Sequence, residues 1–187
     1  MSGDDSDHAL AVRGAAGDSA AFGQLMRRHK EPLYRVIRRM TGDAEESYDL
    51  LQDCFVAMWR AMGRYDPARP FEAWARQVAL NKVRDWGRKR AVRRMVAAVI
   101  PGLERTADLT PDPAPSPETA AADAQELARV DAAIAALPAQ LKEPLVLTAF
   151  DGRSQAEAAA LLGISAKAVE TRVRRARRKL ADIVVRD

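Results

Sequence analysis

The chain has 187 residues and a net charge of only +4, with 48% hydrophobic but only 5% aromatic residues. This length admits two compact helical units of roughly 60 to 90 residues each, with cores of Ala, Leu, Val and Met, which favours an all-α protein. The single cysteine, Cys54, excludes an internal disulfide and a cysteine-ligated metal cluster, and no apolar run reaches the roughly 18 to 20 residues of a membrane span.

Charge is unevenly distributed along the chain. Each of two blocks, Lys82 to Arg94 and Lys167 to Lys179, has seven basic residues and one acid. Between them, Met95 to Leu127 has six acids and one base. Two basic blocks joined by an acidic segment predict two separate contacts with a polyanion.

The N-terminal half shows two helices after a short tail. Residues 1–17 are small and polar, without a sustained apolar period, and are predicted to form a mobile tail. From Asp18 to Met40, apolar residues recur at three- and four-residue steps typical of a helix. Asp43 and Glu46 then fit a capping box that opens a second helix.

The second helix is expected to end near Met62, and a loop from Gly63 to Arg69 follows it. Pro70 fits the first position of the next helix, where its missing N–H costs nothing. An angular count at 100° per residue places five side chains of the second helix on its inward face: Tyr48, Leu51, Phe55, Met58 and Met62. The outward face has Asp49, Gln52, Asp53 and Val56.

A linker separates the two halves. Five of the ten prolines lie between Pro101 and Pro117, in a composition that cannot bury enough apolar area to fold alone. We therefore expect an all-α protein with one small helical domain at 18–94, a flexible acidic linker at 95–126 and a second small helical domain at 127–187.

The C-terminal domain has the pattern of a helix-turn-helix. Ser154 and Glu157 form a capping box, Gly163 ends the short helix, and Ser165 can cap the next one. In that second helix the predicted core stripe is Ala166, Val169, Val173, Ala176 and Leu180.

The opposite face of this helix is basic. It presents Lys167, Thr171, Arg174, Arg175 and Arg178, with Arg172 and Lys179 at its flanks. Such a face suits phosphates and the guanine edge in a major groove. A merely solvated cationic face is the alternative, but solvated faces usually alternate in sign and this one has a single acid, which favours DNA binding.

Carboxylates repel phosphates, so the outward patch of Asp49 and Asp53 is better suited to a basic protein partner than to DNA. Ordinary solvated acids are the alternative.

Several runs together resemble a known family. The runs Asp49-Leu-Leu-Gln-Asp-Cys-Phe-Val-Ala-Met-Trp59, Phe71-Glu-Ala-Trp74 and Asn81-Lys-Val-Arg-Asp85 with Arg88 resemble regions 2.2 to 2.4 of extracytoplasmic-function sigma factors. The run Gly152-Arg-Ser-Gln-Ala-Glu157, continuing through Gly163-Ile-Ser165 to Thr171-Arg-Val-Arg-Arg-Ala-Arg-Arg-Lys-Leu180, is similar to region 4.2 of the same family.

This resemblance implies an alternative sigma factor that binds core RNA polymerase and opens specific promoters. A coiled coil of the largest polymerase subunit would contact Asp49, Gln52, Asp53, Phe55, Val56 and Trp59, and the second domain would approach the flap region. The minus-ten element would contact Arg64, Tyr65, Asp66, Asn81, Arg84, Arg88, Lys89 and Arg90. The minus-thirty-five element would contact Ser165, Lys167, Thr171, Arg172, Arg174, Arg175 and Arg178.

Two details of the minus-ten site stay open in the sequence. Asn81, Asp85 and Arg88 continue one angular stripe, so a hydrogen-bond network that orders the helix competes with direct DNA contact. Arg64, Tyr65 and Asp66 are expected to form a loop pocket for one flipped base, because Tyr65 is the aromatic residue of that loop.

The resemblance also implies an anti-sigma factor as a partner, with the chain monomeric when free or in a 1:1 complex. We expect a cytoplasmic protein without a cofactor, a metal or catalytic residues. The linker would act as a neutral tether or as a nucleic-acid mimic in a basic polymerase channel.

Three rival functions explain less. A dimeric helix-turn-helix regulator leaves the Asp49 to Trp59 surface unexplained. An enzyme is disfavoured because His8 lies in the tail, His29 has no Asp or Cys partner at motif spacing, and Cys54 lacks a neighbouring base. An RNA-binding adaptor would need exposed stacking aromatics, which are scarce.

Overall fold

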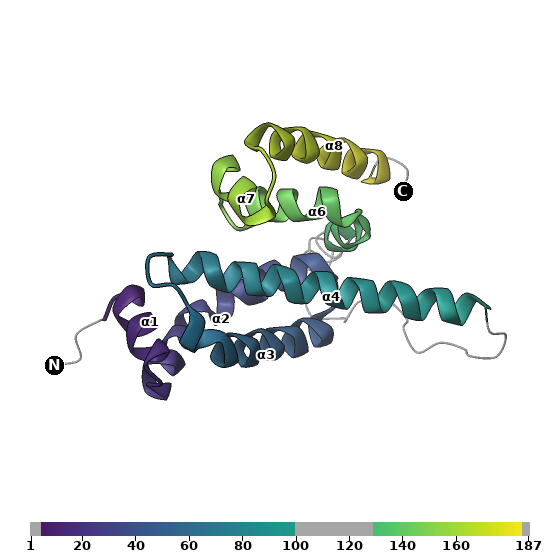
Figure 1. Cartoon of the computed structure of the whole chain (residues 1–187). Coiled ribbons are helices and arrows are strands. Elements are labelled where there is room, and N and C mark those ends of the chain that lie inside the picture. The colour runs from purple at the N-terminus through teal and green to yellow at the C-terminus, as the bar shows by residue number, and fades with distance from the viewer. Residues whose placement is uncertain (1–4, 100–128, 185–187) are drawn as a thin grey trace, which may run out of the picture.

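The computed structural model describes residues 5–99 and 129–184, and within these ranges all regular structure is helical. The N-terminal group consists of α1 (Asp7–Ala15), α2 (Ser19–Thr41), α3 (Ala44–Ala61), η1 (Met62–Arg64) and α4 (Phe71–Val99). The C-terminal group consists of helical residues 129–136, α6 (Ala139–Leu145), the π-helical η2 (Val146–Phe150), α7 (Gln155–Leu162) and α8 (Ala166–Val184). The expected all-α architecture of two small helical groups is confirmed (Figure 1).

Carboxylates cap the starts of α2 and α3, and half of the capping box predicted for α3 is present. The Asp18 carboxylate accepts hydrogen bonds from the first turn of α2, and the Asp43 carboxylate accepts one from the Glu46 N–H. The second half of the expected capping box is missing, because the Glu46 carboxylate instead accepts a hydrogen bond from Trp86 Nε1 at 2.7 Å. This bond ties the start of α3 to α4.

Gly42 ends α2 and also brings the two groups close together. Its φ of 76° is left-handed, which favours glycine. A Cβ at this position would lie 2.6 Å from the Cβ of Ala135, so a side chain would collide with the C-terminal group.

The inward face of α3 is confirmed except at one residue. Leu51, Phe55, Met58 and Met62 are buried, whereas Tyr48 is exposed, and its predicted core position is wrong. The Tyr48 ring stacks on the Tyr34 ring at a centroid distance of 4.5 Å, so its apolar face is covered at the rim of the bundle.

The prediction of a mobile tail at 1–17 is wrong for residues 7–15. These residues form α1, which packs against α2, α4 and η1. Ser6 caps the helix by accepting a hydrogen bond from the Ala9 N–H, while Leu10 and Ala11 are fully buried. Only two apolar side chains and a glycine carry this packing, too few to produce a sustained apolar period in the sequence.

The predicted helix-turn-helix signals are present in the C-terminal group. Ser154 and Glu157 form the complete capping box, Gly163 is left-handed at φ 66°, and the Ser165 hydroxyl accepts a hydrogen bond from the Ala168 N–H at 3.1 Å. Val169 and Ala176 of the predicted stripe are fully buried, and Val173 and Leu180 pack against the core while partly buried. Ala166 is exposed, so its predicted place in the stripe is wrong.

The linker is predicted to begin at residue 95, which is too early. Helix α4 continues to Val99, through the first residues of the segment at 95–126. The remainder of that segment, and with it the path of the linker, lies outside the described residues. In Figure 1, α4 lies between α3 on one side and the C-terminal group on the other.

Candidate functional site

The outward face of α3 is a continuous exposed surface. Asp49, Gln52 and Asp53 are exposed, and two apolar residues beside them are unusually accessible, Val56 at 48% and Trp59 at 41%. The Trp59 ring packs on the Phe22 ring with centroids 5.1 Å apart, and this contact orients Trp59. An accessible aromatic side chain next to apolar area, with polar neighbours around it, is typical of a protein-docking surface.

Phe55 and the neighbouring Cys54 lie beneath this surface. Phe55 is buried in the bundle core, so it supports the exposed face from below and does not itself reach solvent. Burial raises the pKa of the Cys54 thiol to about 12, which keeps it protonated and chemically inert at neutral pH.

The loop after α3 is ordered by Tyr65. This side chain is only 6% exposed, and its ring packs against those of Trp74 and Phe71, with ring centroids 5.2 and 6.0 Å apart. The Tyr65 hydroxyl donates to the Arg69 carbonyl oxygen. Arg64 and Asp66 on either side are exposed. Of the three residues predicted to form a pocket for a flipped base, Tyr65 is therefore part of the core and the other two lie on the surface.

The exposed face of α4 has Asn81, Arg88 and Lys89. Asp85 pairs with Arg88, while Asn81 Oδ1 accepts a hydrogen bond from Gln77 at 3.3 Å. The Asn-Asp-Arg network considered for this helix is thus present only as the Asp85–Arg88 pair. Arg90 lies over the Trp86 ring, with its guanidinium carbon 5.2 Å from the centroid.

Arg84 differs from the other candidate minus-ten residues because its partner lies in the C-terminal group. Its Nε and Nη2 atoms donate to both oxygens of Glu143 on α6, at 2.8 and 2.6 Å. This bidentate pair raises the pKa of Arg84 and joins the two helical groups. While the two are paired, the Glu143 carboxylate offsets the charge that Arg84 could offer to a phosphate.

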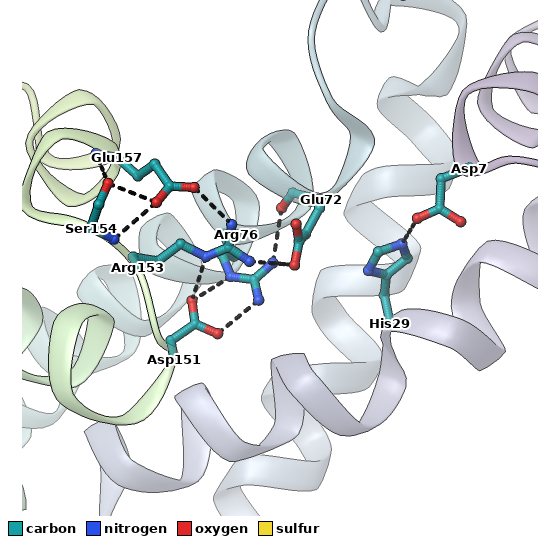
Figure 2. A network of polar contacts seen from close by, with 8 residues as sticks. All are labelled: Asp7, His29, Glu72, Arg76, Asp151, Arg153, Ser154 and Glu157. Atoms are coloured by element: carbon teal, nitrogen blue, oxygen red, sulfur yellow. Dashed lines mark hydrogen bonds and ion pairs between the residues drawn. The ribbon is translucent and has the colours of Figure 1, made fainter.

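A second cluster of charged side chains lies between the two groups (Figure 2). Its buried central pair, Arg76 and Asp151, is not singled out by the sequence. Arg76 of α4 donates to both carboxylate oxygens of Asp151, one of them at 2.7 Å, and pairs with Glu72 at 2.8 Å. Arg153 bonds to Glu72 and Asp151, and to Glu157 at 3.2 Å. Burial alone would raise the pKa of Glu72, but hydrogen bonds and charge from Arg153 and Arg76 outweigh it and lower that pKa.

Two further contacts fasten the C-terminal group to the end of α2. Arg39 pairs with Asp131, and Lys142 Nζ donates to the Met40 carbonyl oxygen at 2.8 Å and to the Ala135 carbonyl oxygen. Burial lowers the pKa of Lys142 to about 8. No sequence signal identifies the α2 partners, because they lie across the linker from Asp131 and Lys142.

The basic face of α8 is accessible. Ser165, Lys167, Arg174, Arg175 and Arg178 are exposed, and Thr171 and Arg172 are partly buried. Lys167 pairs with Glu170, the one acid of this block, at 2.8 Å. In Figure 1, α8 lies on the side of the C-terminal group away from α4. A docked duplex would therefore meet an open cationic surface here.

In the described ranges, no helix is long and apolar enough to cross a bilayer, and no group of three or more His, Cys, Asp or Glu side chains is placed to hold a metal ion.

Comparison with known proteins places both groups of helices in one family. Residues 25–93 match the family model for Sigma-70 region 2, and residues 127–180 match that for Sigma-70, region 4. RNA polymerase sigma factor CnrH of Cupriavidus metallidurans is 42% identical, over 100% of this chain and 98% of its own length. ECF RNA polymerase sigma factor SigE of Mycolicibacterium smegmatis is 32% identical, over 94% of this chain and 67% of its own length. This chain belongs to the extracytoplasmic-function group of RNA polymerase sigma factors.

A solved structure supports the same arrangement of this sigma factor's helices. The structure of CnrH in complex with the cytosolic domain of CnrY matches with a TM-score of 0.70 and 38% identity, covering 98% of this chain and 99% of that one. The expected identification as a sigma factor, which is a transcription initiation factor, is confirmed by these matches.

Proposed function

We propose that this sigma factor binds core RNA polymerase, directs it to specific promoters and promotes their opening, in the cytoplasm and without catalysis of its own. The observation that carries the proposal is the match to both sigma regions in the right order, together with an exposed acidic-apolar face on α3 and an exposed basic face on α8. The unit at 18–94 would bind core polymerase and the minus-ten element. The unit at 127–187, joined to it by a linker, would bind the minus-thirty-five element.

The polymerase would dock on the outward face of α3. Asp49, Gln52 and Asp53 supply charge and hydrogen-bond acceptors for a basic partner, and Val56 and Trp59 supply apolar area. Phe55 contributes by supporting this face. The partner would be the coiled coil of the largest subunit, and the C-terminal unit would approach the flap region.

The minus-ten element would lie along the exposed side of α4 and the loop before it. Arg64 and Asp66 are accessible in the loop, and Asn81, Arg88, Lys89 and Arg90 extend the surface along α4. Arg84 would join them after exchanging Glu143 for a phosphate. Tyr65 would act by shaping the loop, since its ring is already packed.

The minus-thirty-five element would lie against α8. Ser165 and Lys167 are at the start of the helix, where backbone N–H groups also favour phosphate. Arg174, Arg175 and Arg178 follow at spacings that keep them on one accessible side, with Thr171 and Arg172 at its edge.

A protein that holds the two groups together would keep this sigma factor inactive. The contacts of Arg84 with Glu143 and of Arg76 with Asp151 must open if the two DNA-binding faces are to move apart. An anti-sigma factor binding one to one would stabilise the closed arrangement. The complex of CnrH with the cytosolic domain of CnrY supports a partner of this kind.

Reconstituted transcription tests the proposal. Purified core polymerase would be incubated with genomic DNA, with and without this protein, and the transcript starts would be sequenced. New, discrete start sites that require the protein are expected. Starts that are the same in both reactions would reject the proposed function.

A further inference from the structure

Helix α1 lies outside the region 2 match and has no part in the functions proposed above. It packs nonetheless against the loop that leads from α3 to α4. A Cβ at Gly14 would lie 3.0 Å from Cε of Met62, the first residue of η1, which shows how closely α1 approaches the start of that loop. The helix contacts α2 and α4 as well.

A polar contact fixes the start of α1. The Asp7 carboxylate accepts hydrogen bonds from His29 Nε2 at 2.6 Å and Arg28 Nη1 at 2.8 Å, both from α2. Figure 2 shows the Asp7 carboxylate directed at the His29 ring. Burial alone would raise the pKa of Asp7, but these two partners outweigh it and lower the pKa, so the carboxylate is ionised at neutral pH and the His29 nitrogen is the donor.

His29 connects this contact to the aromatic cluster that shapes the loop. Its buried ring packs on Phe71, the first residue of α4, with centroids 5.1 Å apart. Phe71 contacts Trp74 at 5.6 Å and Tyr65 at 6.0 Å, and Tyr65 bonds to the Arg69 carbonyl oxygen. A continuous series of packed groups therefore runs from Asp7 to the loop.

The loop is ordered at its tip as well. The Asp66 carboxylate accepts a hydrogen bond from the Ala68 N–H at 3.0 Å, and the Asp66 carbonyl oxygen accepts one from the Arg69 N–H at 3.0 Å. Both of these bonds lie within the loop itself, so its position on the bundle depends on the aromatic cluster beneath it. Releasing His29 would loosen that cluster.

We infer that α1 is a positioning element for the promoter-opening loop, with Asp7 and His29 as positioning residues that hold Arg64 and Asp66 in place through Phe71 and Tyr65. This inference rests on the proposed function. The polymerase-docking face belongs to a different element, α3, so disrupting the bond between Asp7 and His29 should impair opening and spare polymerase binding.

The test compares Asp7→Asn and His29→Gln with Asp5→Asn in the full chain. Asp5 offers the same chemical change two residues away, and its exposed carboxylate pairs with Arg13 instead. Open complex would be measured by permanganate reactivity at a promoter mapped by the transcript sequencing. Core binding would be measured by titration, and exchange of the loop amides by hydrogen-exchange mass spectrometry.

We expect the Asp7 and His29 variants to form roughly tenfold less open complex, the effect of removing one charge-assisted hydrogen bond. The amides of Asp66, Ala68 and Arg69 should exchange faster, core affinity should stay within about twofold, and Asp5→Asn should behave as wild type. Wild-type opening in both variants, or a loss of opening matched by an equal loss of core binding, would overturn the inference. Failure of the wild-type protein itself to bind core would instead reject the proposed function.

Discussion

The buried ion pair between Arg76 and Asp151 allows a quantitative prediction about how the two helical groups are held together. The two side chains are only 4% and 5% exposed. Removing one partner of such a pair leaves the other charge buried without its counterion, which costs about 3 to 5 kcal/mol. In Asp151→Asn one acceptor oxygen remains, and Glu72 still pairs with Arg76 at 2.8 Å. We therefore expect the lower end of that range, about 3 kcal/mol.

The assay is a urea titration followed by small-angle scattering and circular dichroism, which separate opening of the groups from loss of helix. Asp85→Asn is the matched control, because the Asp85–Arg88 pair is exposed and should contribute about 1 kcal/mol at most. Asp151→Asn should expand at a lower urea concentration than either the wild type or the control. If Asp151→Asn and Asp85→Asn expand at the same urea midpoint, the reasoning is refuted.

Three further outcomes follow from the described side chains. Burial lowers the pKa of Lys142 from 10.5 to about 8, so between those values the unfolded chain binds a proton that the folded chain has released, and stability from this group rises with pH. The free energy of unfolding of wild type minus that of Lys142→Met, measured in urea, should therefore grow from about pH 8 to pH 10; a constant difference would contradict this. Replacing Arg174 and Arg178 with alanine should flatten the log-log salt dependence of promoter binding by about 0.9 for each phosphate that these side chains neutralise, and an unaltered slope would mean that neither touches the backbone. The Cys54 thiol, buried and with a pKa raised to about 12, should react with a thiol reagent only as the chain unfolds, so rapid labelling of the native protein would show that the bundle core is open.

Sequence patterns predict an interaction correctly when both interacting groups lie within a few residues of each other. Ser154 and Glu157 lie three residues apart, and the capping box they predict is present in full. The left-handed glycine at 163 and the buried Val169 and Ala176 follow from equally local rules. The two helical groups and the accessible basic face of α8 could therefore be predicted from the sequence.

Contacts between distant residues could not be predicted in this way. His29 has no partner at motif spacing, yet Asp7 lies 2.6 Å from it across 22 positions of sequence. Tyr65 lies in a loop, where exposure is the ordinary expectation, and its burial depends on Phe71 and Trp74 from the next helix. Glu143 opposite Arg84 comes from the other helical group, and no periodicity encodes that pairing.

The most direct test of the central claim is a titration of labelled full-length protein with purified core RNA polymerase that lacks a specificity subunit. The wild type should bind saturably at one site. Reversing the charges of the α3 face with Asp49→Lys and Asp53→Lys together should weaken binding at least tenfold, while the exposed-pair control Asp85→Asn should leave it unchanged. Absence of saturable binding by the wild type, or equal affinity of the charge-reversed protein, would contradict the account.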